Sequence, residues 1–265
     1  MTHDPGGRTG TATLRGALLA LVLPVLAPAA PARAADATAA DLIAAYPERI
    51  AAIEGNDLVW RDGTRTPISD AIADKDFDTL LERPDIDDMF AIPYRPGPPL
   101  ADPGVNEDPG RIRYEPLFTK MYGDCEKGEV QPQMRDVAWL KGTVRFTTAN
   151  GAADALAAVV DDLRTLPQEM TKYLVPSAGT YNCRRIAGTD RRSMHAYGAA
   201  IDVNTAYADY WLWSKPVGGV YPYRNRIPFA IVAAFESHGF VWGGKWYHYD
   251  TMHFEYRPEL LLQDP

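Results

Sequence analysis

Two short polar segments constrain the fold of this 265-residue chain more than any other feature of its sequence. Residues 193–202 read S-M-H-A-Y-G-A-A-I-D, and residues 246–256 read W-Y-H-Y-D-T-M-H-F-E-Y. Imidazole and carboxylate groups set among apolar and aromatic residues are costly to bury unless they are paired or bind a metal. A fold that buries both segments must therefore bring their polar side chains together.

Residues 1–34 have the features of a cleavable export signal. Two arginines precede an apolar stretch at residues 16–26, and an A-R-A cleavage sequence stands at residues 32–34. The apolar stretch is too short to span a bilayer well. We therefore expect an exported protein, periplasmic or extracellular, that begins near Ala35 and has no stable membrane insertion after signal cleavage.

Charge and composition divide the rest of the chain. Residues 35–110 hold 17 acidic and 6 basic side chains, a net charge of −11, whereas residues 111–265 hold 17 acidic and 18 basic, a net charge of +1. The acidic part argues against nucleic-acid binding, which needs a basic face. Residues 93–110 contain six prolines and three glycines and cannot form a regular element. We expect an acidic N-terminal extension with a Pro-rich linker, residues 35–110, which covers the cleft, extends a groove or completes the core of a domain at residues 111–265.

The two cysteines allow two interpretations. In an oxidising compartment, Cys125 and Cys183 can form an intramolecular disulfide. Metal ligation is the weaker alternative, because they stand far apart in sequence and neither belongs to a C-x-x-C pair.

Hydrophobic patterns predict the secondary structure. Helices are expected over residues 36–53, from a cap at Asn150 to just before Pro167, and from Pro228 to Gly239. Strands are expected at residues 58–60, 143–147, 181–186, 199–203, 241–242 and 253–256. These elements do not alternate as regular βαβ units, so we expect an α+β fold with a mainly antiparallel sheet and packed helices.

His195 and Asp202 are the first candidate pair. Their seven-residue spacing excludes a one-turn helical pair, but the small residues 198–200 allow a turn into a strand that returns Asp202 to the side of His195. An acidic side chain inside an apolar strand is costly unless it is paired or bound to metal. A buried aspartate that caps a loop remains the alternative.

The second segment supplies a further imidazole. A lone histidine such as His253 is more often a core residue than a ligand, but zinc hydrolases use three protein ligands and keep a position for water. His195, Asp202 and His253 form such a set, with donors that suit Zn²⁺. Asp250 could then reach the water as a general base. Glu255 is the rival carboxylate, which could also bind as a ligand or hold a ligand's second ring nitrogen.

These residues resemble the zinc D-alanyl-D-alanine carboxypeptidases of the VanY type, grouped with cell-wall endopeptidases and hedgehog-like domains. The family pattern S-x-H-x-x-G-x-A-x-D stands at residues 193–202, D/E-x-x-H at residues 250–253, and a tryptophan-rich segment at residues 239–246. The likeness covers about residues 115–260. It implies a hedgehog/D-Ala-D-Ala peptidase-like fold and a zinc peptidase domain at residues 111–265 that acts on peptidoglycan stem peptides.

The resemblance also implies roles for single residues. His195, Asp202 and His253 become the zinc ligands, and Asp250 takes the position of the catalytic base, where many relatives carry glutamate. An upstream arginine commonly binds substrate or stabilises the transition state, and similarity favours Arg184 over its neighbour at position 185. A non-catalytic zinc-containing module that binds the cell wall is the alternative function, but it has no need of a base at position 250.

The remaining histidines and aromatic residues allow a structural and a functional interpretation. His238, in the last turn of a helix, suits a structural role, and His248 could line the cleft without being a ligand. Four aromatic residues could form a substrate platform, although such residues are more often core: Tyr197, Trp242, Trp246 and Tyr247.

Overall fold

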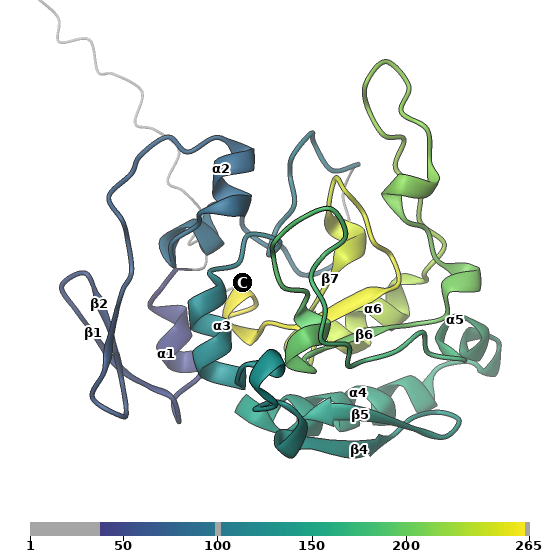
Figure 1. The fold of residues 1–265 in the computed structure, drawn as a ribbon. Helices are drawn as coiled ribbons and strands as arrows, with labels where there is room; N and C mark the ends of the chain where they lie inside the picture. Colours follow the sequence, from purple (N-terminus) through teal and green to yellow (C-terminus); the bar gives the residue numbers. More distant parts are fainter. Residues whose placement is uncertain (1–37, 99–101, 263–265) are drawn as a thin grey trace, which may run out of the picture. The chain divides into compact units, whose positions relative to one another are not determined.

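Three antiparallel sheets and several short helices make up the part of the chain that the structure describes, residues 38–98 and 102–262 of a computed structural model (Figure 1). The first sheet contains β1 (Ile50–Glu54), β2 (Asp57–Trp60) and β3 (Arg65–Pro67). The second contains β4 (Met134–Ala138) and β5 (Thr143–Thr147). The third, in the order β6-β8-β7, contains β6 (Ala200–Asp202), β8 (His253–Tyr256) and β7 (Phe240–Trp242). The expected α+β class with mainly antiparallel pairing is confirmed.

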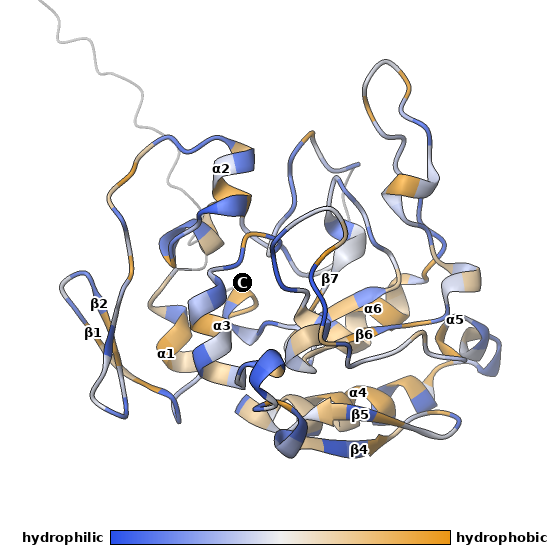
Figure 2. Ribbon diagram, viewed as in Figure 1, coloured by the Kyte–Doolittle hydropathy of each residue, from blue (hydrophilic) through white to orange (hydrophobic). Residues whose placement is uncertain are grey.

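The α-helices pack beside these sheets. They are α1 (Asp41–Ala45), α2 (Phe77–Glu82), α3 (Glu115–Tyr122), α4 (Ala152–Thr165), α5 (Thr171–Leu174) and α6 (Phe229–Glu236). Figure 2 shows hydrophobic residues gathered on α1, α4 and α6. Residues Ala35–Pro265 form one compact unit, whereas the predicted signal peptide, residues 1–34, lies outside the described residues.

The β6-β8-β7 sheet lies between two hydrophobic clusters. One cluster contains Ile201 and Phe254 of this sheet together with the inner faces of α4 and α6. The other contains Ala200 and Val241 together with α1, α3 and residues 58–94. Because successive residues of a strand point to opposite faces, neighbouring strand residues enter different clusters. The β6-β8-β7 sheet carries parts of both polar segments, and residues from the acidic extension cover one of its faces.

Most of the predicted elements are present. The strands at residues 143–147 and 253–256 have the predicted bounds, and β2, β6 and β7 lie within a residue or two of theirs. Helix α4 buries the predicted stripe and ends before Pro167, and α6 begins directly after Pro228. The predicted stripe comprises Leu156, Val159, Val160 and Leu163.

Three local predictions were wrong. The helix expected over residues 36–53 ends at Ala45, because the residue before Pro47 is disfavoured in helical conformation, and residues 50–54 form β1 instead. The helix cap is Gly151 with φ 77°, not Asn150. Residues 181–186 form no strand. Their backbone makes only an isolated bridge, between Arg185 and Arg192, and otherwise bonds to the turn that carries His195, where the Asn182 amide donates to the His195 carbonyl at 3.1 Å.

Candidate metal centre

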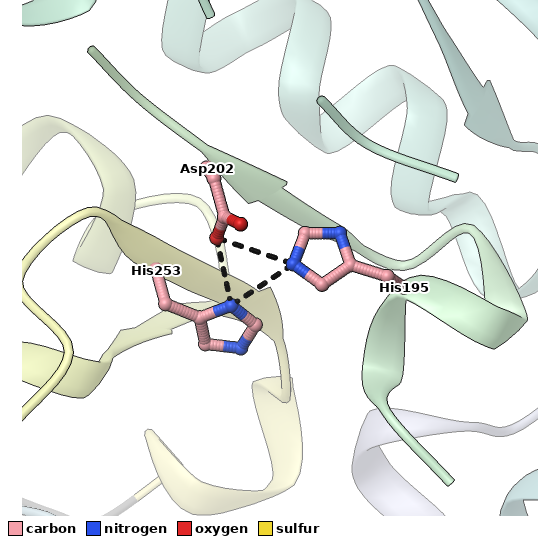
Figure 3. Close-up of side chains that lie close together, drawn as sticks. All are labelled: His195, Asp202 and His253. Atoms are coloured by element: carbon pink, nitrogen blue, oxygen red, sulfur yellow. Dashed lines mark hydrogen bonds and ion pairs between the residues drawn. The ribbon is translucent and has the colours of Figure 1, made fainter. Parts of the chain in front are cut away.

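Three side chains from the two polar segments converge on one point (Figure 3). His195 Nε2 lies 3.2 Å from His253 Nδ1 and 3.1 Å from Asp202 Oδ1. His253 Nδ1 lies 3.0 Å from the same Asp202 oxygen. Four ligands at zinc bond lengths form a tetrahedron with edges of about 3.3 Å. The three atoms are thus spaced as one face of such a tetrahedron, and together they could hold a metal ion.

Strand register places two of the three residues. Asp202 of β6 stands directly opposite His253 of β8 in the antiparallel ladder, so both side chains leave the same face. Ala200 stands opposite Glu255, and its small side chain leaves room on that face for the longer carboxylate. The site is therefore built at the end of a strand pair, with Glu255 two residues behind His253.

A tight turn places the third residue. His195 lies in a 3₁₀ helix, Met194–Tyr197, whose first turn is capped by the Ser193 hydroxyl. Gly198 ends this helix with φ 65° and leads directly into β6. A Cβ atom at this position would lie 2.5 Å from the Met134 sulfur. The Met134 side chain is flexible and could move aside, so it is the left-handed backbone conformation that favours glycine here. The turn returns the chain so that Asp202 faces His195.

Hydrogen bonds fix which ring nitrogens face the site. His195 Nδ1 donates to the Thr180 carbonyl at 2.9 Å, and His253 Nε2 donates to Glu255 Oε2 at 2.8 Å. Both partners only accept hydrogen bonds, so the opposite ring nitrogens present lone pairs to the centre. This arrangement is typical of metal-ligating histidines, whose second nitrogen is held by a carbonyl or carboxylate.

The charges around the centre favour a cation. Burial lowers the pKa of His253, but Asp202 and Glu255 outweigh it and raise that pKa to about 10. Burial also raises the pKa of Asp202, but hydrogen bonds from both imidazoles hold it well below its usual range. These hydrogen bonds need protonated imidazoles. Once both rings are neutral, as metal binding requires, two lone pairs and an ionised carboxylate oxygen point at one another. A divalent metal ion satisfies all three, whereas a proton satisfies only one contact at a time.

Asp250 differs from every other carboxylate near the centre. It lines the same cavity as the three converging residues, and its buried Oδ1 makes no hydrogen bond. Burial raises the pKa of Asp250 to about 6. Its backbone is fixed, because its amide donates to the Gly243 carbonyl at 2.9 Å. Asp250 is thus a positioned carboxylate with a free oxygen, as a proton-transfer group requires.

Glu255, the rival carboxylate, is fully engaged. It is completely buried and accepts hydrogen bonds from His253, Arg113 and Arg257. Besides general base, the sequence left two roles open for Glu255: metal ligand, or partner of a ligand's second ring nitrogen. The structure favours the second role, because Glu255 accepts a hydrogen bond from the second ring nitrogen of His253. The geometry leaves Asp250 as the carboxylate that is free for proton transfer.

The cavity beside the centre has a volume of about 350 Å³ and a basic wall. Arg184 lines it and donates to the Arg185 carbonyl at 3.3 Å. Arg185 instead forms an ion pair with Glu126 at 3.7 Å, outside the cavity lining. Only one of these two neighbouring arginines enters the site.

Sequence reasoning missed two further arginines of this wall, Arg111 and Arg113. Arg113 forms an ion pair with Glu255, and Arg111 donates to Asp108 Oδ2 at 2.7 Å. The same Asp108 carboxylate lies 2.7 Å from His248 Nδ1. These residues belong to or follow the Pro-rich segment, whose irregular composition gives no periodic signal, so no pattern assigned them to the site.

The other aromatic and histidine candidates separate into core and cavity residues. Tyr197 and Trp242 are core residues, each 1% exposed. Trp246 and His248 line the cavity. His238 lies away from it, with Nε2 2.8 Å from an Asp162 oxygen.

A disulfide joins Cys125 to Cys183, with Cα atoms 5.7 Å apart. It ties a 3₁₀ turn, Cys125–Lys127, to the residue directly before Arg184. The bond thus anchors the irregular segment that carries one of the cavity arginines. Across residues 38–98 and 102–262, no helix has the length and apolar character needed to cross a membrane.

Comparison with known proteins agrees with this geometry. The model of a family described as D-alanyl-D-alanine carboxypeptidase matches residues 187–256, the segment that contains both polar motifs. Comparison with curated proteins and with solved structures gives no significant match. The segment that builds the centre is thus similar to the D-alanyl-D-alanine carboxypeptidase family, a family of peptidases.

Proposed function

We propose that this protein is a zinc-dependent peptidase that hydrolyses peptide bonds of peptidoglycan stem peptides in the manner of a D-alanyl-D-alanine carboxypeptidase. One observation carries the proposal: three converging metal-ligand atoms share a cavity with a buried carboxylate oxygen that has no hydrogen-bond partner. The first feature supports metal binding, and the second supports proton transfer beside it.

The donor set fits zinc in particular. His195 Nε2, Asp202 Oδ1 and His253 Nδ1 combine two borderline nitrogen donors with one oxygen. Catalytic zinc sites use three protein ligands, whereas structural sites use four. Among the described residues no fourth histidine, cysteine or acidic side chain joins the group, which favours a catalytic site over a structural one.

The residues around the centre can perform amide hydrolysis. Zinc held there would polarise the scissile carbonyl and lower the pKa of the attacking water toward ~7. Asp250 Oδ1 accepts a proton from that water and then donates it to the leaving amine. Its raised pKa of about 6 suits proton exchange near neutral pH. Arg184, at the cavity wall, donates N–H groups to the oxyanion that develops on the former carbonyl.

The proposal includes export to the cell envelope. Its support is the export signal expected at residues 1–34 and the disulfide, because such bonds persist in oxidising compartments. Peptidoglycan lies in the same compartment, so substrate and enzyme would meet there.

Asp250 separates this proposal from the alternative of a non-catalytic cell-wall-binding module. A module that only binds gains nothing from a buried carboxylate whose oxygen lacks a partner, since such a group destabilises the fold. Active sites commonly retain such destabilising groups for function.

Mass spectrometry of purified peptidoglycan after digestion by the zinc-loaded protein tests the proposal. Loss of a single alanine from stem peptides indicates a carboxypeptidase, and conversion of cross-linked dimers to monomers indicates an endopeptidase. The control is Asp250→Asn, which keeps size and shape but cannot act as a base. Stoichiometric zinc without any product would instead favour the binding module.

A further inference from the structure

A hairpin at residues 211–221, between β6 and α6, carries most of the large apolar side chains that the described surface exposes. Of the seven large hydrophobic residues exposed in residues 38–98 and 102–262, four belong to this hairpin. Their exposed fractions are 55% for Leu212, 61% for Trp213, 74% for Val217 and 47% for Val220. Single exposed apolar residues need no explanation, but a group of them on one element marks a site of interaction.

The tip of the hairpin is an ordered turn. The Val217 amide donates to the Val220 carbonyl at 2.8 Å, and the Val220 amide donates to the Val217 carbonyl at 3.1 Å. Between them, Gly218 and Gly219 have φ values of 61° and 85°. A two-residue turn with a positive φ at both positions is the usual tip of a tight hairpin, and glycine adopts it without strain. In Figure 1 this segment is the light-green loop that stands out before α6.

Aromatic residues hold the base of the hairpin in place. The rings of Trp211 and Tyr221, one at each end, meet edge to face with their centres 4.7 Å apart. The Trp211 amide donates to the Tyr249 carbonyl at 2.9 Å. The Tyr221 amide donates to the Tyr247 hydroxyl at 3.2 Å. Both ends are thus fixed to residues 247–249, and the apolar residues between them stay exposed on a positioned element.

The charge of this segment is opposite to that of the chain. Residues 210–228 contain three basic and no acidic side chains, whereas the whole chain has a net charge of −8. Asp209 pairs with Arg226 at 3.1 Å, which leaves the exposed Lys215 and Arg224 as the positive charges of the hairpin region. Asp102 lines a pocket beside Val220 and offsets part of this charge. An anionic surface is therefore attracted to the segment that exposes the apolar side chains.

The form of this surface favours a lipid bilayer over a protein or a charged polymer. A stable protein interface buries about 800 Å² on each partner, far more than four partly exposed side chains on a narrow hairpin provide. A bilayer accepts a protruding tip, because apolar side chains enter the boundary of the acyl region while basic ones stay among anionic headgroups. Tryptophan favours that boundary as well. An anionic polymer attracts the basic residues but gives the apolar ones no apolar phase.

We propose that the 211–221 hairpin docks the protein reversibly on anionic lipid bilayers, with Trp213, Val217 and Val220 inserted at the headgroup boundary. Trp213 also lines the cavity beside the converging side chains, so docking brings the cavity next to the bilayer surface. The docking goes beyond the proposed peptidase function and depends neither on bound metal nor on peptide cleavage.

Sedimentation with lipid vesicles tests the docking. The chain that begins at Ala35 is used, because it contains the whole compact unit and lacks the apolar residues 16–26. We expect its partition coefficient to be about 25-fold higher for vesicles of equal parts phosphatidylglycerol and phosphatidylcholine than for phosphatidylcholine alone, about 5-fold for each of two basic residues.

Variants of the hairpin separate the charged from the apolar contribution. Lys215→Gln should lower binding to the anionic vesicles about 5-fold. Val217→Ser and Val220→Ser together should lower it at least about 10-fold, because they remove the apolar side chains of the tip. The matched controls Lys141→Gln and Ile72→Ser replace exposed residues outside the hairpin and should leave binding unchanged.

Quenching of tryptophan fluorescence by lipids with brominated acyl chains locates the contact. Trp213 is 61% exposed, whereas Trp60, Trp139, Trp242 and Trp246 are at most 4% exposed. We expect quenching when the protein binds, and Trp213→Phe should remove most of it while binding persists. Binding without quenching, or quenching that survives Trp213→Phe, places the contact elsewhere and overturns the proposal.

Two other outcomes also overturn the docking. Equal binding to anionic and neutral vesicles removes the role of the basic residues. Self-association without vesicles that the double valine variant abolishes assigns the tip to a second copy of the chain. The denaturation midpoint of each variant checks its folding, and the comparison of vesicles and the quenching of the wild type need no variant.

Discussion

Replacing Glu255 with glutamine is expected both to destabilise the protein and to weaken zinc binding at the proposed centre. Glu255 is fully buried, and each of its oxygens accepts two hydrogen bonds. Oε1 accepts from Arg113 Nε at 3.2 Å and from Arg257 Nη1 at 3.2 Å. Oε2 accepts from Arg113 Nη2 and from His253 Nε2 at 2.8 Å. One carboxylate therefore balances two guanidinium groups and orients one imidazole.

The magnitude follows from this geometry. Whichever oxygen becomes the amide nitrogen, two N–H donors then face another N–H group and lose their acceptor. Breaking a buried ion pair by removing one partner costs about 3–5 kcal/mol. We expect the free energy of unfolding of Glu255→Gln to fall by about that amount. Loss of the acceptor for His253 should also weaken zinc binding by about 10- to 100-fold.

Denaturation of the metal-free protein in guanidinium chloride measures the first effect, and competition with a chelator measures the second. Glu54→Gln is the matched control, because its ion pair with Arg65 is exposed, with 56% and 48% of the two side chains accessible. Removing such a pair costs less than about 1 kcal/mol. A Glu255→Gln variant as stable as this control, with unchanged zinc affinity, would refute the role assigned to Glu255.

Three further perturbations test other parts of the structure. Asp250→Asn should lower the release of D-alanine at least about 100-fold while the zinc content by elemental analysis stays the same; lost zinc would point to a ligand role instead. Replacing both cysteines of the disulfide, which stand 58 residues apart, should lower the free energy of unfolding by roughly 4 kcal/mol, read from the denaturation midpoint. Burial raises the pKa of Glu255, but Arg113 and the hydrogen bond from His253 outweigh it and hold that pKa well below its usual range. The stability that Glu255 contributes is therefore complete above about pH 4.3 and is lost as the pH falls toward the folded pKa, so Glu255→Gln should show a smaller loss on acidification than the wild type.

The parts of the fold that sequence predicted are those with a repeating pattern. The buried apolar residues of α4 recur at helical spacing, and those of β5 alternate with exposed residues. Both patterns lie within one short segment, so periodicity suffices to find them. The convergence of Asp202 and His253 needs the register between β6 and β8, which no local pattern contains. The family resemblance supplied that pairing, because it joins motifs that are distant along the chain.

The failures of sequence reasoning occur where single contacts decide the path of the chain. Pro47 ends the first helix early, although the hydrophobic spacing continues past it. Segment 181–186 has strand-like composition, but the disulfide and the bonds to the His195 turn fix it in an irregular path. No sequence pattern assigned Arg111 to the cavity, because its segment is irregular and is positioned by single hydrogen bonds. One of these runs from the Trp246 ring nitrogen to the Pro109 carbonyl at 2.7 Å.

The N-terminal residues matter for the site because β8 is buried on both faces. Glu255 and His253 point to one face of this strand. Water must be excluded from that face if the Glu255 carboxylate is to hold the two guanidinium groups and the imidazole in place. The cover comes from α1 and residues 58–94, and it is tied down by buried hydrogen bonds. Tyr46 donates to Glu259 at 2.6 Å, and Tyr94 donates to Glu236 at 2.6 Å while accepting from the Trp242 amide. Of the three roles open to the acidic extension, these contacts favour completing the core, and it is through that core that residues far from the cavity keep the three converging side chains oriented.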